Sequence, residues 1–374
     1  MFGRGILSYS DIIIPFSLSF LVCFVITPLI RNIAVRWKIC EKPNDRANGD
    51  IAHIGGVAIV AAILVGLVPV FLFLVEEQIL PRVFFPILIV SGFIIFVLGV
   101  IDDLRSLHYK YKLFLQIAAS VIVSLGGIFL LARFFGSALT VQYVVAAFIL
   151  VTLWILAVTS SFNLIDGIDG LATGIAVIAA AELCVAGYIF DIPLVLYTSV
   201  VVLGASVAFL RYNFPPAMIF MGDSGSLFFG LIFGLICIFL VIGAEDVIYR
   251  MAGSIFLLSI PLTDAVLAFL RRAVAGHPVF EADMKHLHYV LLFRFGSMIK
   301  VDFILWSLSL LFGILGILTM AGSLTALITA SILQLVLLFV SFSLMNRSKV
   351  SGERINRIIA DCRKSRNSFA GNSS

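Results

Sequence analysis

The chain has 374 residues, of which 61% are hydrophobic and only 12% are charged, and its formal net charge is +4. Soluble domains carry about 25% charged residues, so this composition excludes an ordinary soluble enzyme and indicates a membrane protein. The apolar runs are continuous and do not alternate with polar residues at every second position, which excludes a β-barrel and predicts membrane-spanning helices of roughly 20 residues each.

Eleven apolar runs of suitable length follow one another, and we predict one transmembrane helix for each. Their ranges are 10–30, 54–75, 83–101, 113–132, 141–162, 171–190, 193–210, 227–243, 251–270, 301–320 and 324–344. The first run is too long for a signal peptide and lacks a small-residue cleavage site, so we interpret it as a retained helix. The predicted fold is an all-α polytopic membrane protein, with one transmembrane catalytic domain over residues 1–345 and a basic tail over 346–374.

Positive charge is distributed very unevenly between the two sides of this predicted bundle. Of the 25 Lys and Arg residues, 21 fall in alternate loops and in the tail. Positively charged loops face the cytoplasm, so we expect an outside N-terminus and a cytoplasmic C-terminus. The net charge then requires no nucleic-acid partner, and the basic tail is interpreted as a topology anchor near anionic lipid, with a disordered end over 367–374.

Acidic residues lie at the same side as this positive charge. Asp102 and Asp103 end the third predicted helix, and adjacent carboxylates repel each other unless a cation lies between them. The pair therefore suggests a metal site, a proton acceptor, or both. The alternative is two solvated loop acids neutralised by Arg105 and Lys110.

The most specific pattern is Asn-Leu-Ile-Asp-Gly-Ile-Asp-Gly over residues 163–170. Asp166 and Asp169 are three residues apart, so one helical turn would place both on one face. Gly167 and Gly170 allow the backbone to approach a ligand closely. A helix N-cap would explain one of these acids and leaves the rest of the pattern unexplained.

Two further loops on this side contain candidate binding residues. Asn213 begins a proline turn that predicts Asp223 at the start of the next helix, and Phe220 between them could stack on a base or lie in the membrane interface. The longest loop contains Arg271, Arg272, His286 and His288, where binding of an anionic diphosphate is at least as plausible as a metal site that includes Asp283. Within the predicted helices, Glu182 is interpreted as buried and neutral, and Asp264 as reaching the cytoplasmic surface or pairing with a cation.

The ordered motifs between about Lys42 and Gly296 resemble one family. They are Asp-Asp, Asn-x-x-Asp-Gly-x-Asp-Gly-Leu-Ala, Asn-x-Pro-x-Ala-x-x-Phe-Met-Gly-Asp-Ser-Gly-Ser, and Arg-Arg followed by His-Leu-His. The chain looks like a polyprenyl-phosphate N-acetylhexosamine-1-phosphate transferase of the glycosyltransferase family 4 type. Such enzymes transfer a sugar-1-phosphate from a UDP-sugar to a membrane polyprenyl phosphate and release UMP.

The resemblance implies a role for each matched residue. Asp223 would bind Mg²⁺, or Mn²⁺ in its place, and Asp102 would deprotonate or orient the attacking lipid phosphate beside a second catalytic carboxylate, Asp103. The nucleotide and sugar would be bound by Asn163, Asp166, Asp169, Asn213, Phe220, Arg271, Arg272, His286 and His288. The expected partners are a UDP-amino sugar, polyprenyl phosphate and, by family analogy, a second copy of the chain, with the active site on the cytoplasmic face of a bacterial inner membrane.

The sequence departs from the family pattern at two places. The first cytoplasmic loop lacks the usual Lys and His, and Tyr289 stands where a further His is common. The branch that uses UDP-MurNAc-pentapeptide usually has three consecutive His, so we favour GlcNAc-1-phosphate transfer to undecaprenyl phosphate at the start of O-antigen, teichoic acid or a similar polymer. The muramyl-pentapeptide enzyme is the alternative within the family. A secondary transporter is the alternative class, and it predicts charged residues near the membrane midplane.

Overall fold

The computed structural model describes residues 9–40, 51–74, 79–135, 140–242, 244–276, 285–347 and 352–370. Helices make up nearly all of this part of the chain. They are α1 (Tyr9–Arg36), α2 (Gly56–Leu74), α3 (Ile79–Leu104), α4 (Tyr109–Phe135), α5 (Val141–Ile165), α6 (Leu171–Ile189), α7 (Pro193–Asn213), α8 (Gly222–Val241), α9 (Val247–Leu257), α10 (Ser259–Ala275), α11 (Leu287–Phe295), α12 (Met298–Met320), α13 (Leu324–Arg347) and α14 (Gly352–Ala370).

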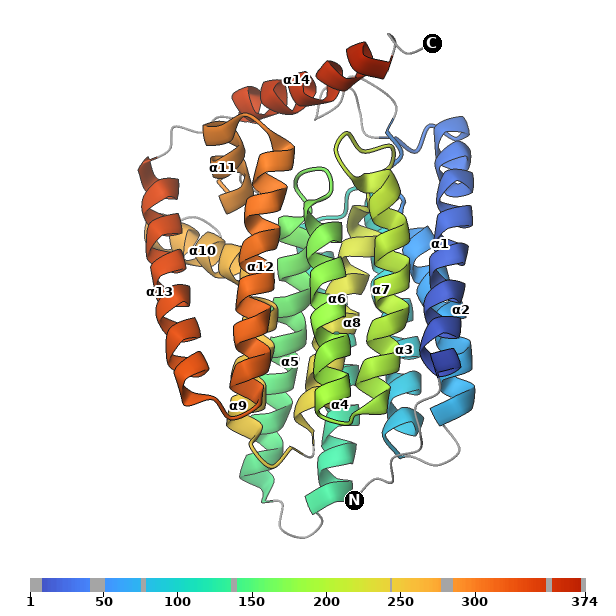
Figure 1. Cartoon of the computed structure of the whole chain (residues 1–374), viewed down its shortest axis with the longest axis vertical. Coiled ribbons are helices and arrows are strands. Elements are labelled where there is room, and N and C mark those ends of the chain that lie inside the picture. Colours follow the sequence, from blue (N-terminus) through green and yellow to red (C-terminus); the bar gives the residue numbers. More distant parts are fainter. Residues whose placement is uncertain are drawn as a thin grey trace.

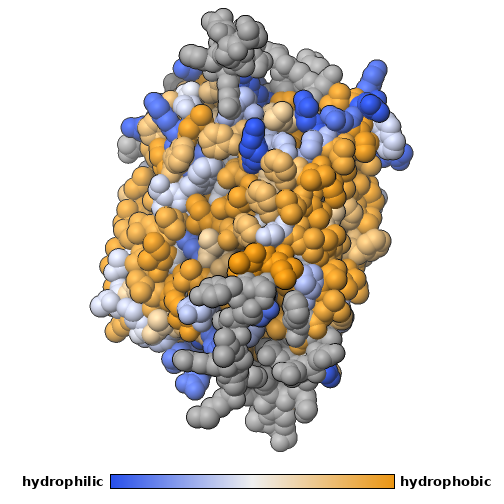
Figure 2. Space-filling view, turned by 45° about the vertical axis from the view of Figure 1, so that its right-hand side comes forward, coloured by the Kyte–Doolittle hydropathy of each residue, from blue (hydrophilic) through white to orange (hydrophobic). Residues whose placement is uncertain are grey.

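Most of these helices stand upright side by side in one bundle (Figure 1). In the described residues, nine helices are long and apolar enough to cross a membrane, the bent pair α9 and α10 makes a tenth candidate, and α2 has a shorter apolar stretch over Gly56–Leu72. The surface carries a hydrophobic belt with hydrophilic residues at both ends (Figure 2). The predicted all-α polytopic membrane fold is confirmed, whereas the side that each end faces stays a prediction.

One expected span differs from the structure. The run 251–270 is not a single straight helix, because α9 and α10 meet at Leu258 with a bend of 79°. Pro261 lies in the first turn of α10, where its ring would clash with the carbonyl of Leu257 in a continuous helix. Apolar composition continues through this break, so hydropathy alone predicts one span. In Figure 1, α10 crosses the direction of the upright helices.

The helix α8 lies at the centre of the bundle and positions the candidate site. Of its most apolar stretch, 89% is buried, and it packs against α2, α3 and α5. Small residues allow close helix contacts in membranes, and a Cβ on Gly230 would clash with the backbone of Thr159 on α5. The N-terminus of α8 therefore lies between the neighbouring helix ends at one end of the bundle.

The C-terminal segment also differs from the prediction. Residues 352–370 form α14, which lies across the end of the bundle (Figure 1). The expected disorder over 367–374 is wrong for residues 367–370, which are helical, while 371–374 lie outside the described residues. Ile355 and Ile359 are fully buried on the inner face of α14. Burial of this apolar face stabilises a helix that composition alone marks as a polar tail.

Candidate active site

Four helix ends bring a lysine, two carboxylates and an amide together at one end of the bundle. Lys112 in the first turn of α4 contacts Asp223 in the first turn of α8, and its Nζ lies 2.9 Å from Asp102 Oδ2 near the end of α3. Asn163 near the end of α5 accepts from Lys112 Nζ at 3.3 Å and donates to Asp223 Oδ1 at 2.7 Å. We call these four residues the carboxylate–lysine cluster.

Lys112 is a site residue that the sequence interpretation missed. The alternative reading of the acids considered Lys110 as a neutralising cation, but Lys110 is exposed. A helical signal was available, because Lys112 shares one face of α4 with the buried residues Gln116, Ala119 and Ser120. This spacing of four, seven and eight residues follows the helical repeat and distinguishes Lys112 from Lys110.

Asp103 lies behind the cluster and holds the start of α8. Its buried carboxylate accepts from the backbone N–H of Asp223 at 2.7 Å, from the Ser224 N–H at 3.1 Å and from Ser224 Oγ at 2.6 Å. The first N–H groups of a helix have no partner within the helix, so a carboxylate from α3 satisfies them and interacts favourably with the helix dipole. Asp103 thereby positions Asp223, and a direct part for it in the reaction stays a prediction.

The segment before α2 supports the same region by pairing with the loop before α8. Phe220 N donates to Ala52 O at 2.9 Å, and Gly55 N donates to Phe220 O at 2.9 Å. A Cβ on Gly55 would lie 2.5 Å from Phe220 O, so only glycine permits this approach. The pairing brings His53 beside the site, with Nδ1 3.4 Å from Asp103 Oδ1 and its ring 5.9 Å from the Phe220 ring.

The Asn-x-x-Asp-Gly-x-Asp-Gly segment does not continue as a helix, so the prediction that Asp166 and Asp169 share a helical face is wrong. The helix α5 ends at Ile165, and α6 starts after Gly170, which has φ +81°. Asp169 is buried, and its Oδ2 accepts from Ala217 N at 2.8 Å. Asp166 lies at the C-terminal end of α5 and is partly exposed.

Asn213 has a buried, connecting position. Its Oδ1 accepts from Gly170 N at 3.2 Å and from Thr173 Oγ1 at 2.7 Å, and its Nδ2 donates to Ile219 O at 3.0 Å. These bonds join the loop before α6 to the loop before α8. Asn213 therefore fixes the two loops relative to each other. The residue is buried, with 2% of its surface exposed.

The histidine segment lies directly against this loop. Tyr289 Oη donates to Gly167 O at 3.2 Å, and a Cβ on Gly167 would clash with His288. His286 Nδ1 lies 2.7 Å from Asp264 Oδ2, and the other oxygen of Asp264 accepts from the first N–H of α11 at 2.7 Å. Asp264 is thus buried and does not reach the surface, and it orients His286; its pairing with a cation stays a prediction.

The two arginines before the histidine segment are buried at 8% exposure each. Arg271 donates from Nη1 to Lys285 O at 2.7 Å and so holds the start of the histidine segment. The structure places Arg272 beside it in α10. Asp283 lies outside the described residues, so the metal site suggested for it is not described.

Two buried acids lie outside these contacts. Glu182 within α6 is 4% exposed and faces Gly313 of α12, as its predicted burial requires. Asp302, which the sequence interpretation missed, is fully buried in α12 beside Gly170. Among the described residues neither carboxylate has a hydrogen-bond partner. Asp302 lies close enough to Asp169 for the two charges to interact, so α12 adds a second buried carboxylate beside the loop before α6.

The cluster has the donor types that a magnesium ion uses. Asp102, Asp223 and Asn163 all direct an oxygen at the Lys112 ammonium, which shows that a cation is accommodated between them. Magnesium typically takes one or two protein carboxylates and completes its octahedron with phosphate oxygens and water. Within the described residues no group of three or more His, Cys, Asp or Glu side chains is arranged for a metal. A magnesium ion here would therefore take part of its coordination from substrate.

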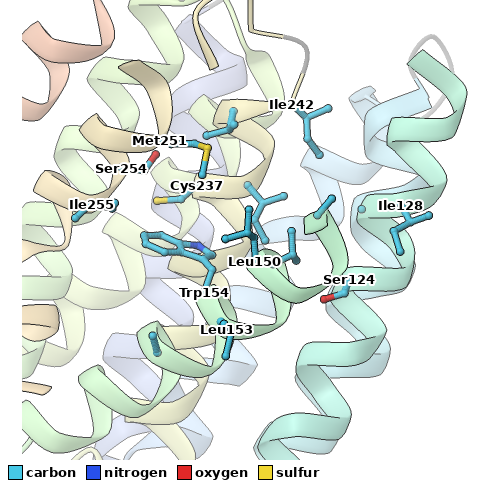
Figure 3. A pocket seen from close by; sticks show the side chains of 16 residues that line it. Ser124, Ile128, Leu150, Leu153, Trp154, Cys237, Ile242, Met251, Ser254 and Ile255 are labelled. Carbon is cyan, nitrogen blue, oxygen red and sulfur yellow. The ribbon is translucent and has the colours of Figure 1, made fainter. Parts of the chain in front are cut away.

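A cavity of about 460 Å³ opens elsewhere, between α4, α5, α8 and α9 (Figure 3). Its lining is mainly apolar and includes Leu150, Trp154 and Ile255. Cys237 in this cavity is fourteen residues from Asp223 along α8, which corresponds to ~21 Å at 1.5 Å per residue. The cavity is therefore separate from the carboxylate–lysine cluster and has no charged side chain for a diphosphate.

Comparison with known proteins identifies the family of this chain. The family model described as "Glycosyl transferase family 4" matches residues 85–241, which contain the whole carboxylate–lysine cluster. A "Probable undecaprenyl-phosphate N-acetylglucosaminyl 1-phosphate transferase" of Bacillus subtilis is 31% identical over 286 residues, which cover 75% of this chain and 77% of the relative. The chain belongs to glycosyl transferase family 4.

Two other relatives place the chain within this family. A decaprenyl-phosphate N-acetylglucosaminephosphotransferase of Mycolicibacterium smegmatis is 30% identical over 305 residues, with 73% of each chain covered. A phospho-N-acetylmuramoyl-pentapeptide-transferase of Staphylococcus epidermidis is 27% identical over 327 residues, which cover 80% of this chain and 96% of the relative. Both branches considered from the sequence are thus represented among the relatives of this family 4 protein.

Proposed function

We propose that this protein transfers N-acetylglucosamine-1-phosphate from a UDP-sugar to undecaprenyl phosphate and thereby starts a lipid-linked cell-envelope polysaccharide. An oxygen of the lipid phosphate forms a bond to the β-phosphorus of the UDP-sugar, and the bond from that phosphorus to the bridging oxygen breaks, so that UMP leaves. The observation that carries the proposal is the convergence of Asp102, Asn163 and Asp223 on Lys112, within the segment that matches the family.

The arrangement of the cluster suits a reaction between two anionic substrates. Phosphoryl transfer depends mainly on positioning and on electrostatic stabilisation of charge at the phosphate oxygens. Magnesium bound at Asp223 would neutralise charge on the diphosphate during transfer. Lys112 would be placed to bind a phosphate oxygen if a metal took its position between the carboxylates.

The carboxylates have different tasks in this proposal. Asp102 is partly exposed and pairs with Lys112 at 2.9 Å, and in this proposal it orients or deprotonates the attacking lipid phosphate. Asp103 keeps its position behind Asp223, because three donors at the start of α8 already use its oxygens. Its negative charge at the helix N-terminus holds Asp223 in place during the reaction.

Separate observations support the identity of the transferred sugar and the side of the membrane that the active site faces. The relatives named as N-acetylglucosaminyl phosphate transferases include the one that is 31% identical, whereas the named muramoyl-pentapeptide-transferase is 27% identical, and the His-Leu-His-Tyr segment at 286–289 favours the first branch. The excess of Lys and Arg at the end of the bundle that contains the cluster supports a cytoplasmic active site in a bacterial inner membrane.

The apolar cavity is proposed to bind part of the isoprenoid chain. Its lining is mainly apolar and includes residues of α5, the helix whose far end contributes Asn163 to the cluster (Figure 3). A long apolar chain whose phosphate lies at the cluster can extend the ~21 Å along the helices to this cavity. Apolar burial there would contribute binding energy for the lipid and none for the nucleotide.

The direct test is UMP release by the purified protein with polyprenyl phosphate and a panel of UDP-sugars, with magnesium present or chelated. We expect turnover with UDP-GlcNAc that requires magnesium. Asp223→Asn should abolish magnesium-dependent turnover, while Asp191→Asn, an exposed carboxylate between α6 and α7 at the other end of the bundle, should leave it unchanged. UMP release that persists in Asp223→Asn would contradict the metal assignment, and preference for UDP-MurNAc-pentapeptide would contradict the sugar assignment.

A further inference from the structure

The C-terminal helix α14 is docked onto the loops of the candidate site. Its buried residues Ile355 and Ile359 face the bundle, and α14 packs against α11. His286 caps the start of α11, and His288 lies in its first turn. Cys362 Sγ also lies 3.4 Å from the backbone oxygen of Gly296, just after α11. These contacts hold α14 across the end of the bundle, above the histidine segment (Figure 1).

From this helix, the side chain of Arg363 reaches into the nucleotide-site region. Its Nη2 donates to Asp169 Oδ1 at 2.5 Å, and its Nε donates to Asp169 Oδ2 at 3.2 Å. The guanidinium carbon lies 4.8 Å from the centre of the Phe220 ring. The Asp169 side chain is fully buried and that of Arg363 is 12% exposed. One guanidinium thus contacts both the acid of the loop before α6 and the aromatic ring of the loop before α8.

These contacts exceed what a membrane-surface anchor requires. An anchoring arginine directs its charge to lipid headgroups and keeps it hydrated, as the exposed side chain of Arg357 on the same helix can do. Arg363 instead gives up hydration for a two-point interaction with a buried carboxylate, which fixes both direction and distance. Since Asp169 also accepts from Ala217 N, the arginine completes a connection between α14 and both loops.

Because Arg363 covers Asp169, this part of the site contains a positive guanidinium beside the negative carboxylate. Asp169 was predicted to contact the nucleotide, yet its carboxylate is covered and its oxygens are used by Arg363 and by Ala217. The group presented here is a guanidinium stacked beside an aromatic ring. Planar guanidinium groups suit phosphate oxygens and aromatic rings, whereas an uncovered carboxylate would repel a diphosphate.

We propose that α14 is the cytoplasmic wall of the nucleotide site and that Arg363 is a positioning residue that sets the affinity for the UDP-sugar. It does so by holding Asp169 and the Phe220 ring in the geometry that receives a nucleoside diphosphate. This inference rests on the proposed function. It assigns to the C-terminal segment a part in substrate recognition beyond the charge that it contributes at the membrane surface.

The test compares Arg363→Gln with Arg357→Gln, which makes the same change of charge at an exposed position of the same helix. For Arg363→Gln we expect the KM for UDP-GlcNAc to rise at least tenfold, which corresponds to about 1.4 kcal/mol. The KM for polyprenyl phosphate and the half-saturating magnesium concentration should stay within twofold of the unchanged protein. Arg357→Gln should leave all three values unchanged, and Arg363→Lys should give an intermediate KM because it restores charge without the two-point geometry.

A binding measurement separates this inference from failure of the fold or of the proposed function. Titration of the detergent-solubilised full chain with UDP should show the same loss of affinity in Arg363→Gln, with an unchanged elution profile on size exclusion. An unchanged KM and UDP affinity in Arg363→Gln would overturn the inference. Tighter UDP binding would also overturn it, since α14 would then compete with the nucleotide. If the unchanged protein binds UDP but releases no UMP from any UDP-sugar, the proposed function fails while the binding result still tests α14.

Discussion

Lys112→Met removes the ammonium group between Asp102 and Asp223 and keeps an unbranched side chain. Two unit charges about 4 Å apart attract by ~4 kcal/mol at an effective dielectric constant near 20. Lys112 makes this interaction with both carboxylates, at 2.9 Å from Asp102 and closer to Asp223. Much of the attraction is offset by the cost of removing the charges from water. The remainder opposes any metal ion that must take the place of the ammonium.

This competition predicts opposite changes in metal binding and turnover. In Lys112→Met, the half-saturating magnesium concentration should fall about tenfold, which corresponds to about 1.4 kcal/mol of released competition. The kcat should fall by about two to three orders of magnitude, as it does when one group that stabilises developing charge is removed. Both values come from UMP release measured across a magnesium titration at saturating substrates.

Lys110→Met is the matched control, because it removes an exposed lysine from the same turn of α4. It should leave the half-saturating magnesium concentration and the kcat unchanged. A half-saturating magnesium concentration that rises in Lys112→Met would refute the reasoning, since the ammonium would then support metal binding and not compete with it. Equal effects in the two variants would assign the change to surface charge.

Two further predictions concern the support of the cluster and the lipid. Gly222→Ala should lower the thermal unfolding midpoint, because its φ of +70° costs an L-residue about 1–2 kcal/mol and its Cβ would lie 2.7 Å from both oxygens of Asp103. Gly127→Ala, where a Cβ meets nothing within 4 Å, should not lower that midpoint, and equal shifts would contradict the packing argument. Ala147→Leu, inside the apolar cavity, should raise the KM for polyprenyl phosphate about fourfold for each methylene displaced, at ~0.8 kcal/mol each, whereas Ala146→Leu, exposed beside it, should not. A KM for the lipid that is equal in both variants would exclude the cavity as part of the lipid site.

Three of the four residues in the carboxylate–lysine cluster were predicted from sequence motifs, and Lys112 was not. Asp102, Asn163 and Asp223 were selected because acids and amides recur at helix ends on one side of the predicted bundle, and the structure brings all three into contact with Lys112. Lys112 was missed because lysine at a helix end is ordinary in a membrane protein. Lys112 can be recognised from the sequence only if the helical repeat is used to ask which polar residues share a face with buried ones.

Asp169 has contacts that the sequence did not predict, while its role at the nucleotide stays a prediction. Asp169 was expected to face the nucleotide, but its oxygens are used by Ala217 and by Arg363, a residue nearly two hundred positions later in the chain. Such a pairing has no local signal, since it depends on how α14 packs. The bend between α9 and α10 had a local signal in Pro261. The predicted span was based on hydropathy alone, which does not register the effect of a proline on the helix.

The sequence by itself determined the class of the protein, the approximate spans and the family. These properties depend on local composition and on motifs, because a span must be apolar over its whole length and backbone groups in lipid must bond within the helix. The tertiary structure decided which oxygens surround Lys112, how Asp103 holds α8, and that α14 belongs to the site. These contacts join residues far apart in the chain, and their geometry exists only once the helices have packed around α8.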